Sequence, residues 1–190
     1  MHEPFFVSFF VVAVAEIGDR TQLLTLLLAA RYRKPWQIVL GILLATVANH
    51  AVAGFAGQFA GSLLTPELLR WSLGISFIAM AAWALVPDKL SDDGTLRGRD
   101  RGAFLVTLTS FFIAEIGDKT QIATAALAAR FDHLLPVVAG TTLGMLAANV
   151  PVVILAQYAG HRINGKWARY VAAAIFACEG VLTLIGVRLF

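Results

Sequence analysis

The chain of 190 residues is 58% hydrophobic and only 14% charged, and its mean hydropathy is +0.76. A soluble domain carries roughly a quarter charged residues, so this composition excludes an ordinary soluble protein and indicates a polytopic membrane protein. The net charge of +3 does not indicate a nucleic-acid partner, because the basic residues lie in short segments between apolar runs. The single cysteine, Cys178, excludes an intramolecular disulfide and a CxxC metal site.

Six apolar stretches follow one another along the chain, and each is long enough to cross a hydrocarbon core of about 30 Å as a helix. They are residues 5–30, 36–60, 68–86, 103–129, 134–159 and 168–189. The first has neither a basic segment before it nor a small-residue cleavage site, so we expect a retained helix rather than a signal peptide. The longest polar segment, PDKLSDDGTLRGRDRG, follows the third stretch. The predicted fold is therefore all-α, with six transmembrane helices and a linker between two halves.

The two halves resemble each other, because a shift of 99 positions superimposes matching residues along much of their length. Gly41 falls on Gly140, whereas Asn49 and Asn149 miss this register by one residue, which predicts a local slip there. Three helices per repeat is an odd number, so the second copy must enter the membrane from the opposite side, as in many secondary transporters. The predicted organisation is a first three-helix repeat, a cytoplasmic linker and a second inverted three-helix repeat within one membrane domain, at residues 1–86, 87–102 and 103–190.

The basic residues at and beyond the ends of the predicted helices are divided unequally between the two sides of the predicted membrane. Ten Lys and Arg residues lie on the side of the linker and three on the opposite side. Cytoplasmic loops carry the excess of positive charge, so the linker is predicted in the cytoplasm and both termini outside it.

Two nearly identical polar segments, AEIGDRTQ at residues 15–22 and AEIGDKTQ at residues 114–121, interrupt the first and fourth apolar stretches near mid-depth. Each charge there costs about 2.5 to 3.5 kcal/mol, so these side chains must contact one another, water or an ion. Together the motifs carry four acids and two bases, namely Glu16, Asp19, Glu115 and Asp118 against Arg20 and Lys119. The surplus of two negative charges predicts a divalent cation or two protons. In inverted repeats the two motifs can face each other, which predicts one central acidic site.

The four acids are the first candidates for metal ligands. The second group comprises hydroxyl and amide side chains of the motifs and of neighbouring helices, namely Thr21, Thr120, Gln22, Gln121, Asn49 and Asn149. Arg20 and Lys119 are predicted to be internal counter-charges. Oxygen ligands suit hard cations such as Mn²⁺, Ca²⁺ or Mg²⁺. Gly18 and Gly117 lie between the acids, where they would permit either local unwinding or close helix approach, and the sequence leaves both open.

Three further interpretations stay open beside the central site. The spacing of Glu16 and Arg20 would also fit a purely structural ion pair, although such pairs leave the surplus charge unbalanced. His50 is a softer candidate for the ion path, but a lone histidine in a helix is more often a packed, hydrogen-bonded residue. Glu179, in FACEG, is a fifth intramembrane acid without a counterpart in the first half, and its candidate role is a proton relay.

Two copies of E-x-G-D-[KR]-[TS], about a hundred residues apart in a six-helix chain, resemble the Gdt family of membrane cation transporters. That family includes Golgi manganese and calcium transporters and bacterial manganese exporters, and both motifs match it without departure. The resemblance implies Mn²⁺ or Ca²⁺ transport in exchange for protons, with no cofactor and with the lipid bilayer as surroundings. The short chain resembles the bacterial members, which favours manganese export and the cytoplasmic membrane. The oligomeric state stays open, and a homo-oligomer is one alternative.

Two other functions compete with the exchanger. A passive cation channel would use the same acids for selection without proton coupling. An intramembrane aspartyl protease would use Asp19 and Asp118 as a dyad, but neither aspartate stands in the GxGD or YD context of such enzymes. No HExxH, GxSxG or phosphate-binding loop occurs in the sequence, so we do not expect an enzyme.

Overall fold

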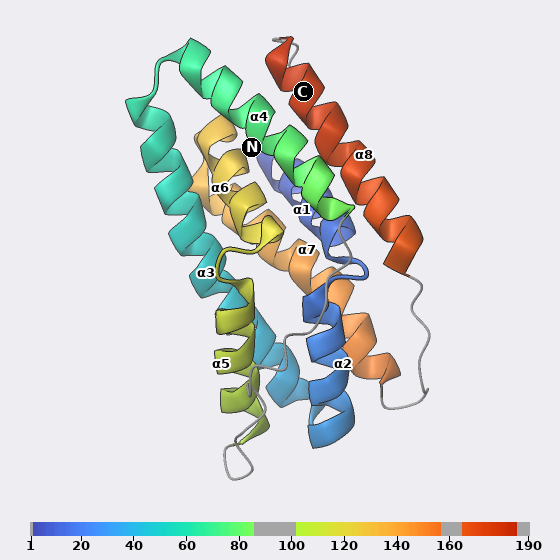
Figure 1. Ribbon diagram of the computed structural model, residues 1–190. Coiled ribbons are helices and arrows are strands. Elements are labelled where there is room, and N and C mark those ends of the chain that lie inside the picture. Colours follow the sequence, from blue (N-terminus) through green and yellow to red (C-terminus); the bar gives the residue numbers. More distant parts are fainter. Residues whose placement is uncertain (1, 86–101, 157–164, 186–190) are drawn as a thin grey trace.

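The computed structural model describes residues 2–85, 102–156 and 165–185 (Figure 1), but not the side chains of some residues within these ranges, Arg20 and Glu179 among them. The described ranges contain helices and no strand, which confirms the all-α class. In chain order the helices are α1 (His2–Glu16), α2 (Arg20–Tyr32), α3 (Pro35–Leu63), α4 (Pro66–Ala84), α5 (Ala103–Glu115), α6 (Lys119–Phe131), α7 (Leu134–Leu155) and α8 (Gly165–Leu184).

The first and fourth predicted spans are each broken in the middle of the polar motif. Gly18 and Gly117 adopt φ values of 79° and 72°, a left-handed conformation that glycine reaches without the steric cost of a Cβ. The backbone at the two breaks is nearly identical, because Asp19 N donates to Glu16 O and Asp118 N to Glu115 O, both at 3.1 Å. Of the two alternatives that the sequence left open, local unwinding at these glycines is confirmed.

Within the described residues, two helices are individually long and apolar enough to cross a membrane, namely α3 and α7. Helix α5 is apolar but shorter. The breaks at the two motifs divide each of two predicted spans into helices of 13 to 15 residues, which are individually too short to cross a membrane. The six-span arrangement therefore stays a prediction.

The helices of the two halves pack on each other rather than forming separate bundles. Helix α1 contacts α7, and α5 contacts α3, while α4 and α8 lie side by side along one side of the molecule in Figure 1. Small residues allow these backbones to approach closely: a Cβ added to Gly140 would lie 2.3 Å from Phe5 O, and one added to Gly57 would lie 2.0 Å from Ala125 O. Such contacts between small residues and backbone are typical of helix pairs in membranes.

Many large apolar side chains lie on the outside of this bundle. Val52, Phe55 and Phe59 on α3 are between 59% and 68% exposed, and Phe10 on α1 and Ile113 on α5 are 59% exposed. Soluble monomers rarely expose apolar surface on this scale, because its contact with water is unfavourable. The interior, by contrast, buries ionisable and polar side chains at the two breaks. This inside-out distribution agrees with a protein surrounded by lipid.

Candidate cation site

Each motif places one acid at the end of a helix and a second acid at the start of the next. Glu16 and Glu115 are the last residues of α1 and α5, whereas Asp19 and Asp118 are the N-cap residues of α2 and α6. All four are at most 1% exposed. Helix N-termini stabilise carboxylates through their free N–H groups, but C-termini repel them. The two glutamates therefore depend on side-chain partners from other helices.

Glu16 receives its partner from α7. Its Oε1 accepts a hydrogen bond from Asn149 Nδ2 at 3.3 Å, and Asn149 Oδ1 accepts one from Thr25 Oγ1 at 2.6 Å. Glu16 Oε2 accepts no hydrogen bond within the part of the chain that the structure describes. Hydrogen bonds to α1 and α2 thus fix the side chain of Asn149, which lies on α7. They engage only one of the two carboxylate oxygens of Glu16.

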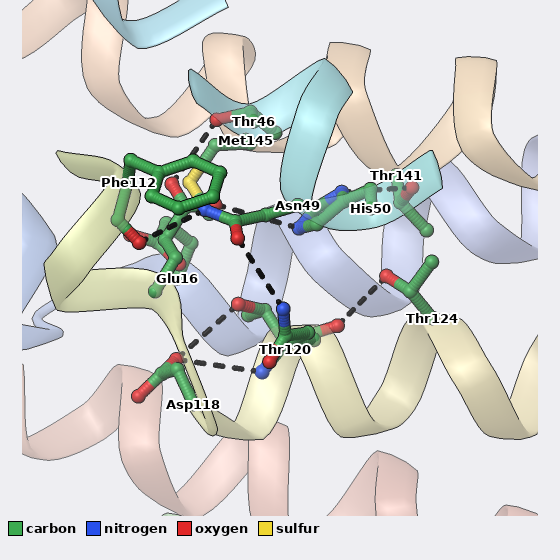
Figure 2. Close-up of polar contacts among 12 residues, drawn as sticks. Glu16, Thr46, Asn49, His50, Phe112, Asp118, Thr120, Thr124, Thr141 and Met145 are labelled. Carbon is green, nitrogen blue, oxygen red and sulfur yellow. Dashed lines mark hydrogen bonds and ion pairs between the residues drawn. The ribbon is translucent and has the colours of Figure 1, made fainter. Parts of the chain in front are cut away.

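Glu115 receives its partners from α3. Its Oε1 accepts a hydrogen bond from Thr46 Oγ1 at 3.1 Å, and its Oε2 lies 3.9 Å from His50 Nε2. On the other side of the imidazole ring, Nδ1 lies 2.9 Å from Thr141 Oγ1 on α7 (Figure 2). His50, Thr46 and Thr141 are all fully buried.

The glutamine of each motif completes the broken turn. Gln22 Oε1 accepts from Gly18 N, and Gln121 Oε1 accepts from Gly117 N, both at 2.7 Å. The Nε2 atoms then reach the opposite half of the chain, where Gln22 donates to Ala148 O at 2.9 Å and Gln121 to Asn49 Oδ1 at 3.4 Å. The amide oxygens that were predicted as ligands are therefore engaged by backbone N–H groups in this conformation.

These contacts fix the register of the two halves around the motifs. Gln22 contacts residue 148 and Gln121 contacts residue 49, and both members of the first pair lie 99 positions from those of the second. By the same shift His50, which faces Glu115, is the counterpart of Asn149, which faces Glu16. The predicted slip near Asn49 is therefore wrong. The sequence instead substitutes histidine for asparagine at this position.

The two motifs meet through a buried ion pair. Lys119 Nζ, from the second motif, pairs with the carboxylate of Asp19 from the first, and both residues are at most 2% exposed. Asp19, Glu115 and Asp118 also lie close enough to act electrostatically on Glu16. The structure thus gathers the four acids into one region. The side chains of Arg20 and Glu179, the second predicted counter-charge and the predicted proton relay, lie outside the described residues.

The threonines and Asn49 complete the region. Thr120 Oγ1 donates to Asp118 Oδ2 at 3.2 Å, and Asn49 Nδ2 donates to Phe112 O at 3.1 Å (Figure 2). Thr21 is fully buried, and its Oγ1 has no hydrogen-bond partner among the described atoms. No three His, Cys, Asp or Glu side chains of the described ranges are arranged to hold a metal ion directly. Ion binding here would therefore also draw on hydroxyl or amide oxygens, or require some side chains to leave their present partners.

Comparison with known proteins shows the family to which the chain belongs. A family model described as the divalent cation/proton antiporter GDT1 matches residues 4–92 and 103–188. The chain belongs to the GDT1 family. This membership confirms the resemblance noted from the doubled motif, and it supports cation transport.

Among GDT1 relatives, a Vibrio cholerae protein named "Putative manganese exporter" is 49% identical over 178 residues, which cover 93% of this chain and 88% of that protein. The GDT1-like protein sll0615 of Synechocystis is 27% identical over 96% of this chain and 97% of its own length. The Arabidopsis thaliana protein PAM71-homolog, chloroplastic, is 26% identical over 96% of this chain and 59% of its own length. No solved structure matches the chain significantly.

Sequence reasoning on this GDT1 chain missed the hydroxyl groups that contact the site. Thr46 and Thr25 hold Glu115 and Asn149, and Thr141 contacts His50. A signal was present, because Thr46 and His50 stand four residues apart and therefore share one face of an otherwise apolar helix. Threonine alone was too common in apolar stretches to single out.

Proposed function

We propose that the protein exports a divalent cation, Mn²⁺ in preference to Ca²⁺, in exchange for protons through a central site built from the two E-x-G-D-[KR]-T motifs. The observation that carries the proposal is the buried ion pair of Asp19 with Lys119, which joins the motifs of the two halves. With Glu16, Glu115 and Asp118 beside it, this pair leaves more negative than positive charge in a buried region. Such a surplus is costly unless a cation or protons neutralise it.

Competition for the same carboxylates would supply the coupling. When Mn²⁺ binds from the cytoplasm, it neutralises acids that otherwise take up protons, and external protons later displace it. The two halves then rock about the central site, and access to the site changes from one side of the membrane to the other only when its charge is neutralised. Lys119 has a defined part in this cycle. Its ammonium group pairs with the Asp19 carboxylate when metal and protons have left, so that the carboxylates do not face one another without a cation.

The proposed architecture is a six-span membrane domain of two inverted three-helix repeats, at 1–86 and 103–190, joined by a cytoplasmic linker at 87–102. The common offset of 99 residues in the contacts of Gln22 and Gln121 supports it, as do the matching breaks at Gly18 and Gly117. In this arrangement each broken helix pair counts as one span. The exposed apolar surface supports a location in the membrane, for which we propose the cytoplasmic membrane with both termini outside the cytoplasm.

Several oxygen-bearing side chains would complete the ligand set around the four acids. Thr21 Oγ1 and Glu16 Oε2 are buried oxygens without hydrogen-bond partners in the described ranges, so they are available to an ion without prior exchange. The remaining candidates would first release a present partner; they are Thr120, Gln22, Gln121, Asn49 and Asn149. Oxygen ligands of this kind suit Mn²⁺ and Ca²⁺, and the name of the Vibrio cholerae relative favours Mn²⁺. Glu179 remains the candidate proton relay.

Purified protein in vesicles tests this function. We expect saturable Mn²⁺ uptake that an imposed proton gradient drives, together with metal-driven proton movement in the opposite direction. Glu16→Gln and Asp118→Asn should both abolish metal-driven proton movement while the protein still folds, because each removes one charge from the site. Unchanged exchange in both variants would contradict the central site.

The same vesicles separate the two rival functions. Metal flux that neither saturates nor responds to the proton gradient would indicate a channel. Cleavage of a transmembrane peptide without metal, lost in Asp19→Asn, would indicate a protease.

A further inference from the structure

The two glutamates of the site face chemically different partners, although the backbone around them repeats. Glu16 faces the amide of Asn149, which donates a hydrogen bond at 3.3 Å. Glu115 faces the imidazole of His50 at the equivalent position, and there the closest approach is 3.9 Å. That distance is too long for a hydrogen bond. The first half thus holds its glutamate through an amide, and the second half presents a ring nitrogen to it without a bond.

The contacts around His50 allow Nδ1 to carry the proton of the neutral ring. Thr141 Oγ1 accepts from His50 Nδ1 when its own hydrogen is donated to Val138 O, which lies 3.2 Å away. In this tautomer Nδ1 is protonated, and Nε2 of the neutral ring carries a lone pair. The opposite tautomer would direct Nε2–H toward Glu115 Oε2, at a distance too long for a hydrogen bond.

The lone pair of Nε2 points toward the acids and has no hydrogen-bond partner in the described part of the protein. A nitrogen lone pair and a carboxylate oxygen attract each other only through something positive between them. Two ligand atoms that share one ion, each at about 2.2 Å from it, lie about 3 to 4 Å apart. The separation of 3.9 Å between His50 Nε2 and Glu115 Oε2 falls in this range. Proteins usually orient a metal-binding histidine by a hydrogen bond from its other ring nitrogen to a nearby acceptor, and Thr141 can accept such a bond from Nδ1–H.

We propose that His50 Nε2 binds the transported cation beside Glu115, as a nitrogen ligand in an otherwise oxygen-based site, and that it selects Mn²⁺ over Ca²⁺ and Mg²⁺. Ca²⁺ and Mg²⁺ take oxygen ligands almost exclusively, whereas Mn²⁺, although it also prefers oxygen, is a first-row transition metal that binds an imidazole nitrogen more readily than they do. One nitrogen therefore penalises the two abundant hard cations more than it penalises Mn²⁺. The inference rests on the proposed export function, and it makes the two halves of the site unequal.

Transport selectivity tests the role of His50. His50→Asn gives the second half the same amide as Asn149, and it should lower the preference for Mn²⁺ over Ca²⁺ about ten-fold in vesicles at one fixed proton gradient. Thr141→Val removes the acceptor of Nδ1–H and should weaken Mn²⁺ binding by a similar factor while Ca²⁺ transport changes less. His133→Asn, the same change at an exposed residue before α7, is the matched control and should leave selectivity unchanged.

Electron spin-echo spectroscopy of bound Mn²⁺ gives an independent readout, on purified protein from which any polyhistidine tag has been removed. The unmodified chain and His133→Asn should show nitrogen coupling from a directly bound imidazole, and His50→Asn should lose it while still binding Mn²⁺. Retained coupling in a folded His50→Asn variant would overturn the proposal. So would an equal loss of Mn²⁺ and Ca²⁺ transport, which would assign His50 a structural role.

These results are distinguishable from failure of the proposed function. If the unmodified chain moves no divalent cation, the export proposal fails. If it exchanges Mn²⁺ for protons but His50→Asn keeps the same ratio of Mn²⁺ to Ca²⁺ transport, only the inference about His50 fails.

Discussion

Two glycines of the structure are required for different reasons, and their substitution offers a quantitative test. Gly117, in the break at the second motif, is required for its backbone conformation, and Gly57, on α3, for close helix packing. Gly117 has a φ of 72°, and a Cβ added there meets no described atom within 4 Å. Gly117→Ala should therefore cost only the left-handed backbone strain, about 1 to 2 kcal/mol of the free energy of unfolding. Gly57→Ala presents the opposite case, because its Cβ would lie 2.0 Å from Ala125 O on α6. Helices α3 and α6 would have to separate, which should cost about 3 kcal/mol or more.

Asparagine distinguishes the two causes. It tolerates left-handed backbone better than alanine, so Gly117→Asn should recover part of the lost stability, whereas Gly57→Asn should be at least as damaging as Gly57→Ala. Denaturant unfolding of the purified protein in one detergent, followed by circular dichroism, measures all four variants. A Gly117→Asn variant that is no more stable than Gly117→Ala would contradict left-handed strain at Gly117. A Gly57→Ala variant that loses less stability than Gly117→Ala would contradict a steric clash between α3 and α6.

Two further predictions concern the partners of the motifs, and the same unfolding measurement checks them. Lys119→Met removes the cation paired with buried Asp19 and should lower the free energy of unfolding by about 3 to 5 kcal/mol, more than Lys119→Arg does. Added Mn²⁺ should restore more stability to Lys119→Met than it adds to the unmodified protein. An equal effect of Mn²⁺ on both proteins would contradict competition between Lys119 and the metal. Gln121→Leu leaves the Gly117 N–H without its acceptor and should cost about 1 to 3 kcal/mol, whereas Gln121→Glu keeps an acceptor oxygen and should cost less. Equal stability of these two variants would contradict the role of Gln121 in the break.

The two apolar helices that are continuous, α3 and α7, were predictable because their hydropathy has no interruption. The breaks in the first and fourth spans were only half predictable. Glycine between two acids permits a left-handed residue, but it equally permits close packing of an unbroken helix. The choice depends on whether the freed N–H groups find acceptors, and these are supplied here by Gln22 and Gln121.

The register of the two halves shows the limit of pattern matching. Asn49 and Asn149 are the same residue type, so an alignment by identity pairs them and inserts a slip. The contacts show instead that Asn149 and His50 occupy equivalent positions in the two halves, because position in space follows the helix register and not the residue type. The uninterrupted shift of 99 positions on both sides of these residues was the sign in the sequence that no slip occurs.

The sequence by itself determined the all-helical class, the family and the presence of two charged motifs in apolar surroundings, because composition and local spacing are properties of the chain. Only the tertiary structure decided that Lys119 pairs with Asp19 of the other motif, and that Glu16 and Glu115 face different partners. These contacts join residues that are between 65 and 133 positions apart in the sequence. Their geometry depends on how α3 and α7 pack against the broken helices, and that packing is not encoded in the spacing of either motif alone.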